Sequence, residues 1–263
     1  THLTEKEIGE IKNSPMAKHW VDGFSIIREA PVKVPVNLVA YIHGSNGMAA
    51  GNTIEEALIQ ATCEVFERHA QIRVIKPGKT VPTIDLASVE NPHIRDMIQF
   101  YKGQNIDVLI KDLSFDGLFP GVGVLFTNHN LKRDRLEFRM LIAAASFNGD
   151  EGLTRCFTEG VQGRETLRNP RPQLDRPILH ESQVNDYYMV MRCGVSMKDL
   201  SFLEQGETRA YQAIKVSGLS SEIEEIKRIC RQLNTDCILL DHTHPVLGFP
   251  VVRVVIPRVS DFL

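Results

Sequence analysis

The chain has 263 residues, of which 43% are hydrophobic and 24% are charged. This composition is typical of a soluble globular protein that is long enough to bury a substantial core. The formal net charge of −3 and the pI of about 6.3 argue against a general nucleic-acid or membrane-surface binder. The sequence contains no signal peptide and no apolar run long enough to span a bilayer. It therefore predicts a cytoplasmic protein that binds neither nucleic acid nor membrane.

The amino-terminal part predicts one strand and two helices. Residues 32–43 alternate and then become apolar, which favours a strand that leads into a glycine-rich loop. A long helix is predicted over residues 53–75. A surface helix is predicted over residues 92–101, with Gly103 as its C-cap.

The middle of the chain predicts three strands followed by a helix. The strand candidates are residues 106–115, 123–127 and 136–145, and the last two are expected to pair as a hairpin. The helix covers residues 151–167.

The carboxyl-terminal part predicts a helix over residues 220–233 and strands over residues 237–240 and 251–256. Helices and strands do not alternate strictly, so the predicted fold class is α+β, a mixed sheet with packed helices. No confident linker is present, and we expect residues 1–263 to form a single domain. Because the chain begins at Thr1 and stops directly after a strand-like run, we also expect it to be a fragment.

The segment from Gly44 to Ala70 carries the strongest functional pattern. Its glycines, Gly44, Gly47 and Gly51, allow close backbone approach to a ligand, and the start of the following helix favours anions. Asn52 or Thr53 is the expected N-cap of that helix, with Glu55 or Glu56 as the capping-box partner.

One face of the predicted helix carries a row of carboxylates. At the helical period, Glu64 and Glu67 fall within about 80° of Glu56. Like charges at this spacing repel one another, so a row of them in a pocket needs a cation. An anion site next to such a row fits a polyphosphate bridged by magnesium, which binds through one or two carboxylates and substrate phosphates. The alternative is a solvated acidic helix, which is the commoner origin of a charge run.

The predicted helix over residues 151–167 has a similar polar line of Arg155, Glu159 and Gln162. If the polar lines of the two helices face each other, they enclose four carboxylates and an arginine. Carboxylates there could hold Mg²⁺, and Arg155 could contact a phosphate. Taken alone, Arg155 and Glu159 are better explained as a surface pair at i,i+4 spacing, worth a few tenths of a kcal/mol, and only the two helices together favour a site. Arg253, between valines of a strand, points either into a polar pocket or to solvent.

The segment SNGMAAGNTIEEALIQATCEVFERHA closely resembles the central motif of the YcaO-domain family. The segments RCFTEGVQGR and FPVVRVVIPRVSDF resemble later blocks of that family in the same order. The amino-acid sequence is most similar to that of stand-alone bacterial members. The resemblance implies a YcaO-type ATP-binding fold. It also implies ATP-dependent activation of peptide backbone amides by phosphorylation of the amide oxygen, leading to azolines, thioamides or a related modification of a peptide or ribosomal protein.

The family resemblance implies ATP and Mg²⁺ as cofactors. Carried onto matching positions, it implies a nucleotide site made by Asn52, Glu56, Glu64, Glu67, Arg68, Arg155 and Glu159. Of these, Glu56, Glu64, Glu67 and Glu159 are the expected metal ligands, and no catalytic residue is assigned.

The resemblance also implies that the chain lacks an earlier block of the complete domain, a loop containing Lys and Gly followed by its own glutamate-bearing helix. The expected partners are a peptide or protein substrate and a companion protein, and the family makes a homodimer plausible. A non-catalytic alternative remains, in which the chain keeps the fold and binds a peptide or partner protein as a scaffold.

Overall fold

The computed structural model of the chain describes residues 9, 13–133, 138–161 and 199–260. The chain divides into two compact units, one made by residues 1–65 and 218–263 and the other by residues 66–217. Each unit contains one five-stranded sheet. Helix α3 (Ile54–Ile75) belongs to both, because its first half lies in the first unit and its second half in the second.

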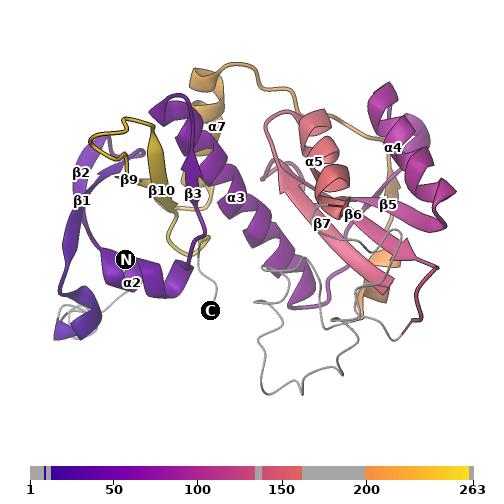
Figure 1. Ribbon diagram of the computed structural model, residues 1–263, viewed down its shortest axis with the longest axis horizontal. Helices are drawn as coiled ribbons and strands as arrows, with labels where there is room; N and C mark the ends of the chain where they lie inside the picture. Colours follow the sequence, from indigo (N-terminus) through magenta and orange to yellow (C-terminus); the bar gives the residue numbers. More distant parts are fainter. Residues whose placement is uncertain (1–8, 10–12, 134–137, 162–198, 261–263) are drawn as a thin grey trace. The chain divides into compact units, whose positions relative to one another are not determined.

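The first unit is built on an antiparallel sheet in the order β2-β1-β9-β10-β3 (Figure 1). Its strands are β1 (Trp20–Ser25), β2 (Ala30–Pro35), β3 (Met48–Ala50), β9 (Ile238–Asp241) and β10 (Val251–Val255). One face packs through Val34, Leu240 and Val255 against Val39 of helix α2 (Val36–His43). Helix α7 (Leu219–Gln232) buries an apolar side of its own, which includes Ile226.

The second unit is a sheet in the order β7-β6-β5-β4-β8. Its strands are β4 (Thr83–Ile84), β5 (Ile106–Asp112), β6 (Gly121–Asn128), β7 (Arg139–Ala145) and β8 (Thr208–Arg209). All neighbours are antiparallel except β4 and β8. One face is covered by α4 (Pro92–Gly103) and α5 (Gly149–Val161), which pack through residues such as Ile98 and Phe157. The opposite face packs against the second half of α3 and the short helix η6 (Leu200–Glu204).

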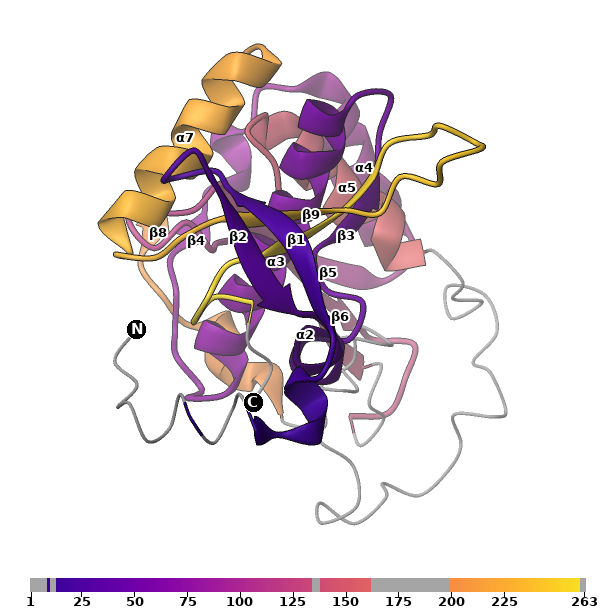
Figure 2. The ribbon, with the colours of Figure 1, turned by 90° about the vertical axis from the view of Figure 1, so that its left-hand side faces the viewer.

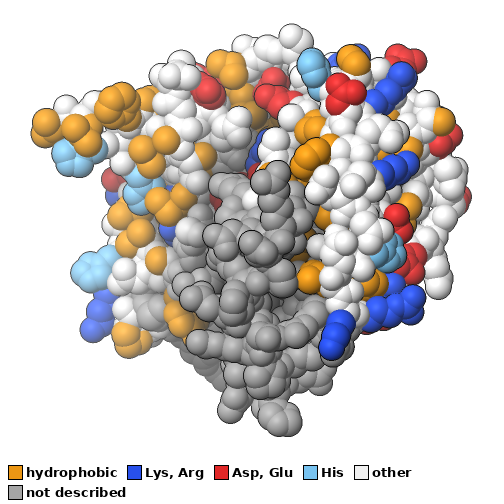
Figure 3. Space-filling model, turned by 45° about the vertical axis from the view of Figure 1, so that its right-hand side comes forward, with side chains coloured by type: hydrophobic (Ala, Val, Ile, Leu, Met, Phe, Trp, Pro, Cys, Tyr) orange, Lys and Arg blue, Asp and Glu red, His pale blue; other side chains and the backbone are white. Residues whose placement is uncertain are grey.

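Short 3-10 helices complete the described secondary structure. They are η1 (Pro15–Ala17) and η2 (Leu86–Ser88). None of the helices within the described ranges is both long enough and apolar enough to cross a bilayer. In the view of Figure 3, acidic and basic side chains of the described residues are interspersed on the surface.

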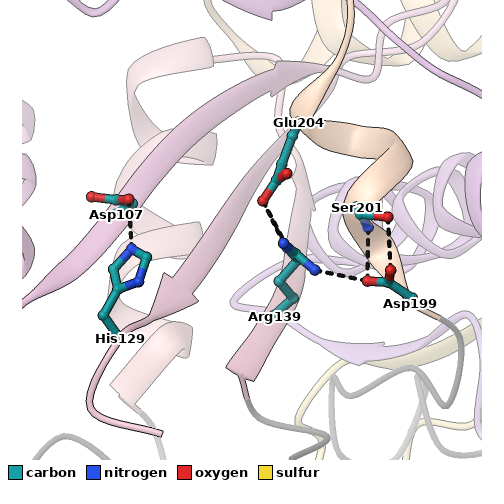
Figure 4. A network of polar contacts seen from close by, with 6 residues as sticks. All are labelled: Asp107, His129, Arg139, Asp199, Ser201 and Glu204. Atoms are coloured by element: carbon teal, nitrogen blue, oxygen red, sulfur yellow. Dashed lines mark hydrogen bonds and ion pairs between the residues drawn. The ribbon is translucent and has the colours of Figure 1, made fainter. Parts of the chain in front are cut away.

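Helix η6 is fixed to the edge of the second sheet by one arginine (Figure 4). Arg139 of β7 binds Asp199 at 2.8 Å and Glu204 at 2.7 Å. The Ser201 hydroxyl, which donates a hydrogen bond to Asp199, is the main reason why the pKa of Asp199 is below its usual value. Two carboxylates on one guanidinium therefore hold the start and the end of η6 against β7.

The predicted α+β fold class is confirmed, and several predicted elements are found. The long helix, the hairpin of β6 and β7, helix α7 and strands β9 and β10 all form close to their predicted positions. The predicted helix at residues 151–167 begins at Gly149, and its second part lies outside the described residues, as does Gln162.

Residues 36–43 form helix α2, not the second half of a strand. Pro35 ends the strand because it has no N–H to donate to a ladder. Val39 and His43 then follow at helical spacing and are buried. The prediction that Gly103 caps α4 was also wrong. The helix includes Gly103, and the left-handed position after it is taken by Asn105 (φ 60°), a residue type that tolerates this conformation.

The loop between β9 and β10 exposes apolar side chains (the yellow hairpin of Figure 2). Val246, Leu247 and Phe249 are 84%, 65% and 70% exposed. The ring nitrogen Nδ1 of His244 accepts the N–H groups of Val246 and Leu247 at 3.2 and 3.4 Å. The loop is therefore held in a defined shape although its side chains face solvent.

The four cysteines within the described residues are buried free thiols. Cys63, Cys230 and Cys237 belong to the first unit and Cys156 to the second. Free buried thiols agree with the absence of a disulfide pattern in the sequence.

Lys111 of β5 is a buried cation without a carboxylate partner among the described residues. Its ammonium group donates to the Thr83 hydroxyl at 2.6 Å and to the Gln205 carbonyl at 2.9 Å, and its side chain is fully buried. Burial lowers the pKa of Lys111 from 10.5 to about 8. Lys111 therefore links β4 and β5 to the segment that leads into β8, at an electrostatic cost.

This cost predicts a pH-dependent stability. The folded state releases the Lys111 proton near pH 8, whereas the unfolded state keeps it up to about pH 10.5, so the free energy of unfolding should rise across this window. The full effect is roughly 3 kcal/mol. Lys111→Met should remove this rise, and urea unfolding of both proteins between pH 7 and 10.5 measures it. Lys102→Met, at an exposed position of α4, is the control that should keep the rise. A parallel pH dependence in the Lys111→Met and parent proteins would contradict the assignment.

Candidate functional site

The start of helix α3 joins two of the predicted site residues. The Thr53 hydroxyl oxygen accepts the N–H of Glu56 at 3.2 Å, which makes Thr53 the capping residue. In return, Oε2 of Glu56 accepts both the backbone N–H and the side-chain amide of Asn52, each at 2.9 Å. The predicted capping interaction is therefore confirmed, and it fixes Asn52 and Glu56 to each other.

The glycine-rich loop orients the second predicted carboxylate. The N–H of Gly47 donates to Oε2 of Glu64 at 3.0 Å, while the Gly47 carbonyl accepts the N–H of Val254 at 2.7 Å. The loop is thus attached to β10 and to α3 at the same residue. The sequence predicted that the glycines of this loop allow close approach to a ligand and that the start of the following helix favours anions. In the structure the N–H of Gly47 is directed at Glu64, so this loop orients the carboxylate.

Arg253 of β10 binds the beginning of this loop. Its side chain is 8% exposed, and Nη2 donates to the Gly44 carbonyl at 2.8 Å. Burial lowers the pKa of Arg253. Of the two orientations that the sequence left open, the buried one is found, and its guanidinium holds the beginning of the loop whose middle binds Glu64.

Arg155 of α5 contacts predicted site residues from both helices. Its Nη2 lies 3.5 Å from Glu67 of α3 and 3.5 Å from Glu159, one turn further along α5. Its Nη1 donates to the Ala145 carbonyl at the end of β7 at 3.3 Å. The polar lines of α5 and the second half of α3 therefore face each other at Arg155, which is the arrangement that the sequence had left open. The i,i+4 pair of Arg155 and Glu159 is present, and Arg155 also contacts Glu67, whose side chain is only 13% exposed.

Cys156 is a neighbour of this cluster that the sequence reasoning did not identify. Its thiol is buried, and its pKa is raised first by burial and then by the negative charges of Glu67 and Glu159. A thiol in this environment stays protonated and is a poor nucleophile. The sequence places Cys156 next to Arg155, but it does not show that the thiol is buried near Glu67 and Glu159, because that depends on packing.

The remaining predicted residue, Arg68, lies directly after Glu67 on α3 and is half-buried. Within the described ranges, the structure brings Asn52 together with Glu56, Gly47 with Glu64, and Arg155 with Glu67 and Glu159. The first two pairs belong to the first unit and the last group to the second.

The donor chemistry of these residues fits Mg²⁺, a hard cation that prefers oxygen ligands. Glutamates repeat along the polar side of α3, and Glu159 stands beside Glu67 at Arg155. No group of three or more His, Cys, Asp or Glu side chains among the described residues converges into a complete metal cage. The arrangement therefore suits a metal that takes one or two carboxylates and completes its shell with phosphate oxygens and water.

A curated relative supports the resemblance seen in the sequence. The Escherichia coli protein named ribosomal protein S12 methylthiotransferase accessory factor YcaO is 26% identical over 236 residues, covering 88% of this chain and 39% of the relative. The chain thus spans well under half the length of this relative.

Solved structures show the same fold. A heterocyclase described as in complex with substrate and cofactor matches with a TM-score of 0.69 at 21% identity, over 92% of this chain and 33% of that one. The structure of YcaO from Methanopyrus kandleri, described as bound with AMPPCP and Mg²⁺, matches with a TM-score of 0.61 at 20% identity, over 92% of this chain and 63% of that one.

The family model described as YcaO cyclodehydratase, ATP- and Mg²⁺-binding, matches residues 11–260. This span includes both polar helices, the glycine-rich loop and the strand that carries Arg253. The chain therefore belongs to the YcaO family.

Proposed function

We propose that this chain binds ATP with Mg²⁺ along the polar side of helix α3 and contributes to ATP-dependent modification of peptide backbone amides. The observation that carries the proposal is the pair of contacts from Arg155 to Glu67 and Glu159. These contacts place one arginine between carboxylates of the two segments that most resemble the family motifs. A phosphate group needs such a cation, and its metal needs such carboxylates.

The proposed roles follow from the local geometry. Glu56, Glu64, Glu67 and Glu159 are the metal-ligand candidates because their carboxylates lie at the polar sides of α3 and α5. Asn52 orients Glu56, and Gly47 orients Glu64. Arg155 and Arg68 supply positive charge for phosphate oxygens.

Bound ATP would supply a phosphoryl group to the oxygen of a substrate amide, which makes the amide carbon open to attack by a side-chain nucleophile or by sulfide. Phosphoryl transfer depends mainly on positioning and on neutralisation of charge. The residues of this chain provide both through oriented carboxylates and Arg155. The buried, protonated Cys156 is not a nucleophile in this scheme. We further propose that the substrate is a peptide or protein, that the product is an azoline or a thioamide, and that the chain acts with a companion protein and as a homodimer. Residues 1–263 are proposed to form one part of a larger YcaO domain.

Calorimetric titration with a non-hydrolysable ATP analogue, with and without Mg²⁺, tests the proposal. We expect Mg²⁺-dependent binding that is lost in Glu64→Gln, because a neutral amide is a weak metal ligand. Glu55→Gln is a matched control. Glu55 lies on the same helix and is exposed, so its replacement should leave binding unchanged. Binding that ignores Mg²⁺, or that survives Glu64→Gln, would exclude a metal-bridged nucleotide on α3.

A further inference from the structure

The second unit contains a cleft that the proposed nucleotide site does not use. It consists of two adjoining cavities of about 590 and 450 Å³, which share Asp112, Asp116 and Arg209 as lining residues. Each has the size of an ordinary small-ligand pocket. The cleft lies where β5 ends and the connection to β6 begins, and we call it the sheet-end cleft.

The middle of the sheet-end cleft is a polar bridge of charged side chains. Arg209 of β8 lies 3.7 Å from Asp112 and 3.3 Å from Asp116, and it also pairs closely with Glu207. Oδ1 of Asp112 also accepts the N–H of Ser114 at 2.8 Å. The solvent-exposed carboxylates and the guanidinium offer acceptors and donors side by side. A ligand crossing this bridge is best matched if it has both N–H and C=O groups.

The smaller cavity has a cationic wall. The Arg73 guanidinium lies 4.4 Å and the Lys79 ammonium 5.4 Å from the centre of the Phe115 ring. No carboxylate among the described residues forms an ion pair with either cation. With both cations at the Phe115 ring and lining the same cavity, a carboxylate or phosphate bound there would be attracted by both.

The backbone that presents the Phe115 ring adopts an uncommon conformation. Phe115, Asp116 and Gly117 have φ angles of 52°, 61° and 81°. Left-handed conformations cost about 1 kcal/mol or more for residues other than glycine and are concentrated at functional sites. Here the strained turn places Phe115 beneath the two cations and Asp116 beside Arg209. The turn therefore builds both the cationic wall and the polar bridge.

The larger cavity is mainly apolar. Ile84, Val122, Ile214 and Tyr211 form its sides, and Gly152 leaves room beside Val122. A pocket with apolar walls and a few polar groups at its edge suits an uncharged, apolar side chain.

We propose that the sheet-end cleft binds an extended peptide segment. An apolar side chain of the peptide enters the larger cavity, its main chain bonds to the bridge of Asp112, Asp116 and Arg209, and an acidic side chain lies against Arg73 and Lys79. An extended peptide combines these three properties in order, since its main chain alternates donors and acceptors between side chains. The inference rests on the proposed function, because it makes this peptide the segment of the substrate that the chain recognises.

A random octapeptide display library, selected on the full chain without nucleotide, tests the proposal. We expect enriched peptides to carry Asp or Glu a few residues from an apolar side chain. Fluorescence anisotropy of the best enriched peptide should show affinity reduced about tenfold or more by Arg73→Glu combined with Lys79→Glu. Both positions are exposed, so the fold should persist. Lys102→Glu, a charge reversal at an exposed site on α4, is the matched control and should change nothing.

A charge exchange makes the test specific. Replacing the acidic residue of the selected peptide by Lys should abolish binding to the parent protein and restore it to the doubly reversed variant. The proposal is overturned if no peptide is enriched, if enriched peptides lack acidic residues, or if they bind the variant equally well. Displacement of the peptide by inorganic phosphate or by ATP at equal concentration would assign the two cations to phosphate and would overturn it as well.

Failure of this proposal and failure of the proposed function can be distinguished. Peptide binding is measured without nucleotide, and Glu64→Gln should leave it unchanged. If the cleft selects acidic peptides but the chain binds no Mg²⁺-nucleotide, the cleft stands and the assignment of its peptide as a substrate is lost.

Discussion

Glu67→Gln is expected to reduce Mg²⁺-dependent ATP hydrolysis about a thousandfold or more without unfolding the protein. Glutamine has the size of glutamate but lacks the charge that a metal ion and Arg155 both need. The Glu67 side chain is mostly buried and lies 3.5 Å from Arg155. Loss of its negative charge should therefore weaken metal binding and also remove the ion pair with Arg155. Phosphate release in the complete protein measures the rate, and circular dichroism confirms the fold.

The matched control for this experiment is Glu151→Gln. Glu151 lies in the first turn of α5 and is exposed, so its replacement should leave turnover within about a factor of two. Parental turnover in Glu67→Gln would remove α3 from the nucleotide site and leave the Arg155 cluster as a structural ion pair. Glu64→Gln should behave like Glu67→Gln if the row on α3 acts as one ligand set.

Gly47→Ala is expected to have the largest effect on stability. Gly47 has a φ of 74°, and a Cβ atom there would lie 2.4 Å from the Val254 carbonyl oxygen and 3.0 Å from a Val65 methyl group. The carbonyl belongs to a strand in the centre of the unit and cannot move away without breaking the ladder. We expect a loss of roughly 3 kcal/mol or more in the free energy of unfolding, from the φ angle and from overpacking.

Gly218→Ala separates these two causes. Gly218 also has a positive φ, 95°, but no atom lies within 4 Å of the added Cβ. It should therefore lose only about 1 kcal/mol. Urea unfolding of both variants gives the comparison. Equal losses of unfolding free energy in the two variants would show that the added methyl group at residue 47 does not clash with Val254.

The sequence predicted helix α3 well, because that helix has strong local signals. Residue type and period gave the polar row through Glu67 and narrowed the cap to Asn52 or Thr53, and the structure selects Thr53 with Glu56. The contact of Arg155 with Glu67 did not follow from the sequence, because the helical period gives the polar line of each helix but not the surface that this line meets.

Other features depended on tertiary structure. The strand β1 was missed because its large apolar side chains, Trp20 and Phe24, lie on its exposed face. The more buried face carries a glycine and a serine beside Val21, so the usual apolar alternation is absent. Helix α2 was mistaken for strand because eight apolar-rich residues satisfy either period. The left-handed turn at Phe115 could not be predicted, because nothing in the type of residue 115 favours a positive φ. The buried amine of Lys111 likewise looked like an ordinary strand residue.

The buried thiols also allow local unfolding of each unit to be measured by alkylation. Alkylating reagents modify a cysteine only when its surroundings open, so the rate at each position measures a local unfolding equilibrium. In a Cys193→Ser background, Cys156 reports on one unit, and Cys63, Cys230 and Cys237 report on the other. Mass spectrometry of pulse-labelled protein would then show whether a ligand slows labelling in both units or in one. A ligand held by Glu67, Arg155 and Glu159 should slow labelling of Cys156, which belongs to the same unit as all three.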